Sequence, residues 1–407
     1  MKLAQRMSRL GTETAFEVLA VVNALKAQGR DIVSFSIGEP DFDTPENIRE
    51  AAKKALDEGH THYTPSAGVM AFREVLADYI NRTRGTDYAP ANVVVTPGAK
   101  PIMFFTILAL ADEGDEVVYP NPGFPIYESM IDFVGAKAVP LPLVEEHAFS
   151  FDAERLEDLV SEKTRLLILN SPQNPTSGVV PRESLQKVAE LAEKYDFYVL
   201  SDEIYSRLVY DGEFQSITRF PGMTERTIIL EGHSKTYAMT GWRLGYGVMP
   251  EELAVAIGQL MTNSNSCTSD FTQMAGIEAI TGPQDGADRM KQIFQERRDI
   301  IVDGLNAIEG ITCLKPEGAF YVWPNVTGVC QTLGLPDSKA LQNYLLHEAG
   351  VAVLGRQCFG RRAPEEDQEY VRFSYASSID AIREGLKRIE EAVGDTDRAQ
   401  AFLQKQA

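Results

Sequence analysis

Cysteine and histidine are scarce in this 407-residue chain, and neither forms a metal-binding pattern. The four cysteines lie far apart without a CxxC pair, and the five histidines lack the spacing of a zinc site. We therefore expect reduced thiols in a cytoplasmic protein, with neither a disulfide framework nor a bound metal.

Positive charge and long apolar runs are also lacking. The chain has 39 Lys and Arg against 59 Asp and Glu, a formal net charge of -20. So acidic a protein has no general electrostatic reason to bind nucleic acid or an anionic membrane. The most apolar run, 101–111, is too short to span a bilayer. Arg6 and Arg9 precede an apolar stretch, but Glu17 interrupts it, so 13–28 predicts an amphipathic helix rather than a signal peptide.

Short apolar runs alternate with segments of helical period through the first two thirds of the chain. The apolar runs are 93–96, 116–119, 165–169, 197–201, 227–230 and 244–249, and the helical segments include 101–111, 124–134, 153–161 and 182–195. This alternation predicts an α/β fold with a mainly parallel central sheet flanked by helices. We assign the large domain to 47–285.

A different pattern begins near residue 286. A long charged helix, 287–308, is followed by short strands at 311–314, 320–323, 351–354 and 370–374 and by helices at 338–348 and 379–393. The tail after Asp395 is expected to be frayed or loosely helical. The pattern predicts a smaller α+β domain over 286–407, joined by an N-terminal segment, 1–46.

Five loops that we expect at the carboxyl ends of strands carry reactive or ligand-binding groups. Lys235 follows the run 227–230, and a lysine in such a place can lose its proton and attack a carbonyl. Arg243 stands between Gly241 and Gly245, which let its guanidinium approach a phosphate closely. Taken alone, each residue also fits an ordinary surface position.

The other three loops supply complementary groups. Asp202 and Tyr205 follow 197–201, and Asn174 lies in a proline-rich loop after 165–169. Gly98 and Ala99 leave free N–H groups at the start of a helix, which is an anion cradle. Together the five loops provide an amine, a carboxylate, a phenol, an amide and a phosphate cradle with an arginine. Those are the groups that pyridoxal phosphate (PLP) requires.

With these residues in place, the chain resembles the class I/II, fold-type I aminotransferases of the aspartate aminotransferase family. The resemblance runs from about residue 10 to 393 and includes IGEPDF at 37–42, NSPQNPTSG at 170–178, SDEIY at 201–205, SKTYAMTGWRLGY at 234–246 and VRFS at 371–374. It implies a PLP-dependent aminotransferase that acts on an amino acid and a 2-oxo acid. It also implies a homodimer with shared active sites.

The resemblance implies a role for each matching position. Lys235 holds the cofactor as a Schiff base and moves the substrate's α-proton, Asp202 pairs with the ring nitrogen, and Tyr205 hydrogen-bonds beside the ring. The other cofactor-binding positions are Gly98, Ala99, Lys100, Phe124, Asn174, Ser234, Arg243 and, from the neighbouring subunit, Tyr63. Arg372 binds the substrate's α-carboxylate, assisted by Asn174 and Gly38. Gly232 stands where many relatives have a serine, so phosphate binding leans more on Ser234 and Arg243.

The residues leave the substrate open. Lys100 on the cradle loop favours an aspartate-like donor, Glu17 favours a basic donor, and aromatic or neutral donors are further alternatives. A PLP-dependent lyase is the alternative reaction, although no clear extra acid for a leaving group is present. A non-catalytic binding protein is disfavoured because Lys235 and Asp202 are both present, and a nicotinamide dehydrogenase because GxGxxG is absent. His233, beside the lysine, is expected to pack structurally.

Overall fold

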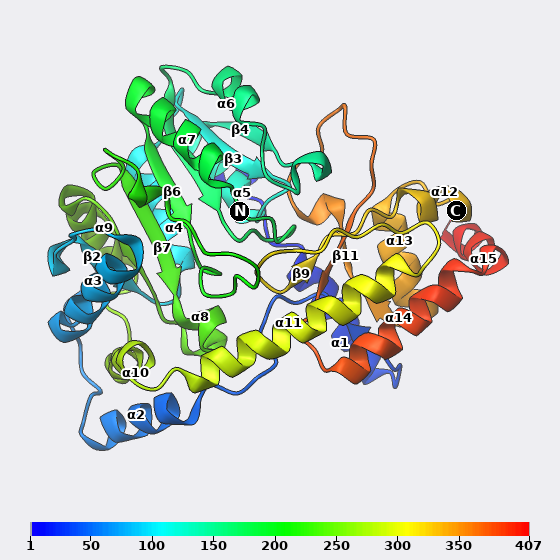
Figure 1. Ribbon diagram of the computed structural model, residues 1–407, viewed down its shortest axis with the longest axis horizontal. Coiled ribbons are helices and arrows are strands. Elements are labelled where there is room, and N and C mark those ends of the chain that lie inside the picture. Colours follow the sequence, from blue (N-terminus) through cyan, green and yellow to red (C-terminus); the bar gives the residue numbers. More distant parts are fainter. Residues whose placement is uncertain (1, 407) are drawn as a thin grey trace.

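A seven-stranded sheet forms the centre of the computed structural model, which describes residues 2–406 (Figure 1). Its strands, in the order β2-β8-β7-β6-β5-β3-β4, are parallel except β8, which runs antiparallel to both neighbours. The strands are β2 (Val93–Thr96), β3 (Glu116–Asn121), β4 (Lys137–Pro142), β5 (Thr164–Asn170), β6 (Tyr198–Asp202), β7 (Thr227–Gly232) and β8 (Gly245–Val248). The predicted fold class is confirmed.

Helices cover both faces of this sheet because its strands are apolar on both sides. On one face, Val94, Ile168 and Leu200 pack against α4 (Lys100–Leu110), α5 (Ile126–Val134) and α9 (Glu251–Ser264). The opposite face packs against two groups of helices. These are α6 (Ala153–Leu159) and α7 (Arg182–Tyr195) at one end, and α2 (Glu46–Asp57), α3 (Met70–Arg84) and α10 (Asp270–Thr281) at the other.

The C-terminal third forms a separate layer of helices beside two small sheets. The long helix α11 (Asp285–Asn306) lies along α14 (Ile379–Val393), as Figure 1 shows. The other helices are α12 (Thr327–Leu333), α13 (Ser338–Tyr344) and α15 (Thr396–Gln406). One small sheet is antiparallel and has the order β11 (Leu354–Gly355), β12 (Val371–Ser374), β9 (Tyr321–Val322).

The N-terminal segment lies against this C-terminal layer. After α1 (Ala15–Ala27), strand β1 (Val33–Ser34) pairs in parallel with β10 (Val351–Ala352). This pairing brings the N-terminal segment beside the C-terminal third of the chain. The domain boundaries at 46 and 285 stay predictions.

Three local expectations differ from the structure. Strand β4 was not predicted, because its two prolines disguise an edge strand, where a missing N–H is tolerated. Residues 311–314 form no strand ladder, only an isolated bridge from Thr312 to Asn325. The tail after Asp395 is not frayed: α15 buries Phe402, whose ring lies 5.5 Å from that of Tyr344.

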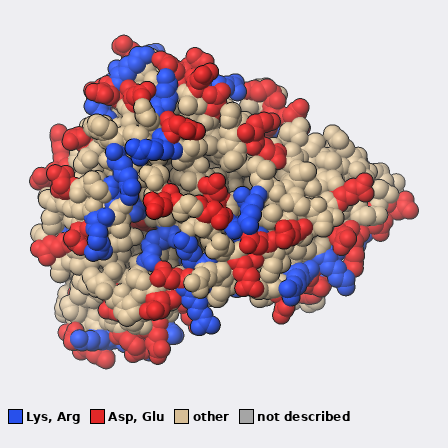
Figure 2. Space-filling view, in the orientation of Figure 1, with Lys and Arg blue, Asp and Glu red and all other residues tan. Residues whose placement is uncertain are grey.

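Charged side chains of both signs are interspersed over the face shown in Figure 2. Between residues 2 and 406, no helix is long and apolar enough to cross a membrane. Over the same range, no group of three or more His, Cys, Asp or Glu side chains could hold a metal ion.

Candidate active site

The chemistry-bearing loops meet at one edge of the seven-stranded sheet. Strands β2, β5, β6 and β7 all end at this edge, as the parallel register requires. Arg243 reaches it differently from our expectation, since it precedes β8 instead of following a strand. Because β8 is antiparallel to its neighbours, its amino end lies where the other strands have their carboxyl ends.

A cavity of about 530 Å³ opens at this edge and contains most of the residues predicted from the sequence. Predicted residues that line it are Gly38, Ala99, Lys100, Phe124, Asn174, Asp202, Tyr205, Ser234, Lys235, Arg243 and Arg372. Gly98 lies directly behind the Arg243 guanidinium, so that a side chain at Gly98 would collide with it.

Lys235 lies in the short helix α8 (His233–Thr236) and extends into the cavity. Its Nζ donates a hydrogen bond to the carbonyl oxygen of Gly38 at 2.6 Å. Desolvation by burial lowers the pKa of Lys235 to about 8, although the carboxylates of Glu39 and Glu13 oppose that shift. Near neutral pH the amine is therefore much easier to deprotonate than an exposed lysine.

Asp202 ends β6 and is buried on the cavity floor. Its carboxylate accepts hydrogen bonds from the Tyr127 hydroxyl at 2.6 Å and from the Ile204 N–H at 3.3 Å. Desolvation nevertheless raises the pKa of Asp202 to about 6. A cation brought against this buried carboxylate would stabilise its charged form. Sequence reasoning missed Tyr127, whose position after a Pro-Ile pair carries no recognisable signal.

The loop after β2 and the start of β8 form a compact cradle for an anion. Gly98 has φ 86°, and helix α4 begins two residues later, so the N–H groups of Ala99 and Lys100 come before the first hydrogen bond of the helix, from the Ile102 N–H to the Ala99 carbonyl. Gly245 permits the close approach, because a Cβ there would meet the backbone nitrogen of Ala99. The Arg243 guanidinium is held beside the cradle by donating to the Thr240 carbonyl at 2.8 Å.

Arg372 of β12 also lines the cavity. It donates to the Asn174 side-chain oxygen at 2.8 Å and to the Ser36 carbonyl at 2.5 Å. Its Nε is buried and has no hydrogen-bond partner within residues 2–406. A ligand carboxylate would satisfy this group, since an arginine fork matches a carboxylate in shape and charge.

Tyr321 joins several of these groups and was not predicted. Its hydroxyl lies 2.7 Å from that of Tyr205, and the Arg372 guanidinium lies 4.6 Å from the centre of its ring. Gly38 must be glycine here, because a Cβ would collide with the Tyr321 hydroxyl. Burial, reinforced by Tyr321, keeps the pKa of Tyr205 well above its usual value, so Tyr205 stays a neutral hydrogen-bonding phenol.

Lys100 stands at the mouth of the cavity, at the start of α4. Its Nζ forms an ion pair with Glu13 at 2.9 Å and lies 5.2 Å from the ring centre of Phe124. Glu17, the other charged residue considered for substrate selection, is exposed on α1 and does not line the cavity. Sequence reasoning thus identified the lysine and missed the glutamate that contacts it.

The aminotransferase class I and II family model matches residues 30–389 of this chain. A probable aspartate/prephenate aminotransferase of Aquifex aeolicus is 39% identical over 96% of this chain and 98% of its own length. An aspartate aminotransferase of Bacillus subtilis is 36% identical over 97% and 99%. The chain belongs to this family. It is an aminotransferase, and the family is PLP-dependent.

Solved structures agree with this assignment. The structure of a Thermus thermophilus aspartate aminotransferase with maleate superposes on the present aminotransferase with a TM-score of 0.90 at 36% identity. The match covers 96% of this chain and 100% of the other. An aspartate aminotransferase of Rhizobium meliloti also gives a TM-score of 0.90, at 34% identity, covering 97% and 99%.

Tyr63 and His233 also lie outside the cavity. Tyr63, in the loop between α2 and α3, is 89% exposed and lines no part of the cavity within its own chain. His233 is fully buried among Phe72, Tyr237 and Tyr246. Burial lowers the pKa of His233 to about 4. The imidazole is therefore neutral near pH 7, and its contacts are packing contacts.

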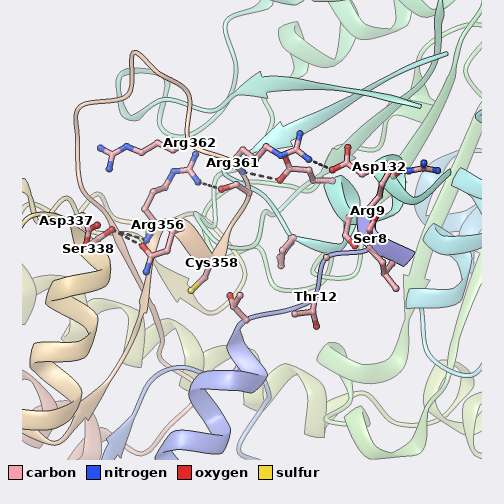
Figure 3. Close-up of a pocket in the computed structure, with 18 of the residues that line it drawn as sticks. Ser8, Arg9, Thr12, Asp132, Asp337, Ser338, Arg356, Cys358, Arg361 and Arg362 are labelled. Atoms are coloured by element: carbon pink, nitrogen blue, oxygen red, sulfur yellow. Dashed lines mark hydrogen bonds and ion pairs between the residues drawn. The ribbon is translucent and has the colours of Figure 1, made fainter. Parts of the chain in front are cut away.

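A second cavity, of about 560 Å³, lies on the other side of the N-terminal segment (Figure 3). Three of the four arginines that line it pair with carboxylates, while Arg9 donates to backbone carbonyl oxygens. Arg356 pairs with Glu366 at 2.5 Å, and Arg361 pairs with Glu128 at 3.0 Å. Four arginines and four carboxylates line this cavity, so it is balanced in formal charge.

Proposed function

We propose that this aminotransferase moves the amino group of aspartate, or a similar L-amino acid, to a 2-oxo acid such as 2-oxoglutarate by ping-pong transamination. The observation that carries the proposal is the pair of cations on one cavity, Arg372 inside it and Lys100 at its mouth. A substrate with two carboxylates matches both. The relatives are named for aspartate, and the ligand named with the Thermus protein, maleate, is a dicarboxylate.

The donor set of the cavity fits PLP. The cofactor, when bound, supplies an aldehyde for the amino group and a protonated ring that withdraws electrons. Gly98, Ala99, Ser234 and Arg243 would hold its phosphate, and Phe124 would stack on its ring. Asp202 would face the ring nitrogen, where a positive charge relieves the cost of burying the carboxylate.

Lys235 would hold the cofactor's aldehyde and then move the proton of the substrate's α-carbon. Its lowered pKa supports both tasks, because each needs the neutral amine. Tyr205 and Asn174 would donate hydrogen bonds beside the ring oxygen. Asn174 is itself fixed, since its backbone N–H donates to Asn170 at 2.9 Å.

Arg372 would bind the α-carboxylate, which every amino acid substrate carries. Asn174 and the backbone at Gly38 flank the same space and would assist it. Because this contact is common to all donors, it orients the substrate without selecting among side chains. Selection is left to groups farther out, of which Lys100 is the cation.

We further propose a homodimer in which Tyr63 completes the neighbouring subunit's site. The supporting observation is a tyrosine that is 89% exposed in the single chain, since large aromatic side chains are common at interfaces. A cytoplasmic location is part of the proposal as well, because the four cysteines are all free thiols.

A screen of half-reactions tests the proposed donor. The PLP-loaded enzyme is mixed with single amino acids, and the cofactor's absorbance is followed. Aspartate and glutamate should react with higher kcat/KM than alanine, arginine or phenylalanine. Lys100→Met should lower kcat/KM for aspartate at least about tenfold, since a charge-assisted hydrogen bond contributes roughly 1.5–3 kcal/mol.

The same screen separates the alternatives. A preference of the wild-type enzyme for arginine or lysine would refute the dicarboxylate proposal. Release of ammonia with a pyruvate-like product, without formation of the amino form of the cofactor, would indicate a lyase instead.

A further inference from the structure

The cation proposed to recognise the second carboxylate already has a carboxylate partner from its own chain. Lys100 Nζ and Glu13 Oε2 are 2.9 Å apart. The Lys100 side chain is 45% exposed and that of Glu13 is 21% exposed, so the pair stands at the cavity mouth and is reachable from it. Glu13 also lines the cavity and is one of the carboxylates that oppose the lowering of the Lys235 pKa.

Glu13 lies in a stretch of the N-terminal segment without regular structure, at 10–13. The segment is fixed on both sides of this stretch. Arg9 donates to the carbonyl oxygens of Asp132 and Phe133 at 2.8 and 3.1 Å, and α1 begins at Ala15. Between these anchors, few backbone hydrogen bonds would have to break for Glu13 to leave Lys100.

The segment also divides the two cavities of this side of the molecule. Arg9 and Thr12, labelled in Figure 3, line the second cavity, while Glu13 and Phe16 line the first. The orientation of Glu13 toward the substrate cavity thus follows from the path of the segment. Glu17, four residues farther along, has no such contact.

A lysine ammonium has three donors, but two carboxylates held on one ammonium repel each other. A substrate carboxylate must therefore displace Glu13 or share Lys100 with it at a cost. We propose that Glu13 is a specificity-determining residue that competes with the side-chain carboxylate of dicarboxylate substrates for Lys100. This inference rests on the proposed function, since it takes Lys100 as the reader of that carboxylate.

Two consequences follow from the competition. Dicarboxylates bind less tightly than Lys100 alone would allow, whereas a donor with a neutral side chain leaves the ion pair intact. The effect should be modest because the pair is partly exposed. Ion pairs between partly exposed side chains contribute little free energy. We therefore expect the affinity for a dicarboxylate to change only roughly two- to fivefold.

The test measures binding of succinate, a dicarboxylate that has no amino group to transfer, to the PLP-loaded enzyme by titration calorimetry. Glu13→Gln and Glu13→Ala should each lower the Kd for succinate roughly two- to fivefold at low salt. The gain should shrink at high salt, because screening weakens the ion pair. Glu17→Gln is the matched control and should leave the Kd unchanged.

A double-mutant cycle with Lys100→Met completes the test. In the Lys100→Met background, Glu13→Gln should leave the Kd for succinate unchanged, because no cation remains for the two carboxylates to compete for. The ratio of kcat/KM for aspartate to that for alanine should rise in Glu13→Gln alone.

The outcomes separate this inference from the proposed function. If Lys100→Met weakens succinate binding but neither Glu13 variant tightens it, the competition is refuted and the substrate proposal stands. If Lys100→Met has no effect on succinate or on the aspartate-to-alanine ratio, both fail. An equal gain in affinity for succinate from Glu13→Gln, in the presence and in the absence of Lys100, would also refute the competition.

Discussion

Replacing Asp202 by asparagine should stabilise the cofactor-free protein at alkaline pH while abolishing efficient catalysis. Burial raises the pKa of Asp202 from 3.8 to about 6, against two hydrogen bonds that lower it. A carboxyl group with a raised folded-state pKa contributes stability that is fully present below pH 3.8 and is lost as the pH rises through about 6. Asparagine carries no charge and does not incur this loss.

The size of this loss of stability follows from the difference between the folded-state and unfolded-state pKa of Asp202. At about 1.36 kcal/mol per pKa unit, the whole loss is about 3 kcal/mol, of which about 1.4 kcal/mol falls between about pH 5 and pH 8. The unfolding free energy of Asp202→Asn relative to wild type should therefore rise by that amount over this interval. Urea denaturation of the cofactor-free proteins measures it.

An exposed carboxylate serves as the control, and Asp158→Asn should show no such pH dependence. Loading PLP should reverse the order of stability, because the ring's positive charge is matched by the carboxylate and not by the amide. Turnover of Asp202→Asn should fall steeply, since breaking a buried charge pair costs about 3–5 kcal/mol. Parallel stability curves from pH 5 to pH 8 would refute the reasoning.

Three further outcomes are expected. Borohydride reduction of the PLP-loaded enzyme, followed by peptide mapping, should find the label on Lys235, and Lys235→Ala should bind PLP without turning over; a label on another lysine would contradict this. The rate at which the cofactor-free enzyme takes up PLP covalently should rise with pH through about 8, because only the neutral form of Lys235 attacks an aldehyde. Mixing Lys235→Ala with Tyr63→Phe subunits should regain activity, because a hybrid dimer then has one site with both lesions and one intact site. No recovery despite proven subunit exchange would show that Tyr63 does not act across the interface.

The sheet was predictable from the sequence because its strands are buried on both faces. Six apolar runs gave six strands, and helix α14 coincides with its predicted range, 379–393, where Ser378 caps the helix by accepting from the Ala381 N–H. The short strands β9, β10 and β11 were harder to bound, since two-residue strands leave no periodicity to measure. The tail is helical, which was one of its two expected states, but its firm order depends on packing against a distant residue, Tyr344, that local sequence does not reveal.

The loops of the candidate site were recognisable because they follow strands and carry unusual combinations of residues. The residues that contact these loops from distant parts of the chain were not recognisable from the sequence. Tyr127 and Tyr321 lie 75 and 116 residues away from the groups they contact, Asp202 and Tyr205. A tyrosine whose hydroxyl finds its hydrogen-bond partner only after folding cannot be distinguished in the sequence from an aromatic residue of the apolar core.

The two glutamates near the cavity mouth show why the orientation of a side chain is harder to predict from sequence than its chemical type. Glu13 and Glu17 are four residues apart and chemically identical, and a continuous helix over 13–28 would put both on one face. The helix instead begins at Ala15, which leaves Glu13 in the irregular stretch before it and turns its carboxylate toward Lys100. A shift of two residues at a helix start, within the usual uncertainty of such boundaries, thus separates the glutamate that contacts Lys100 from the one that does not.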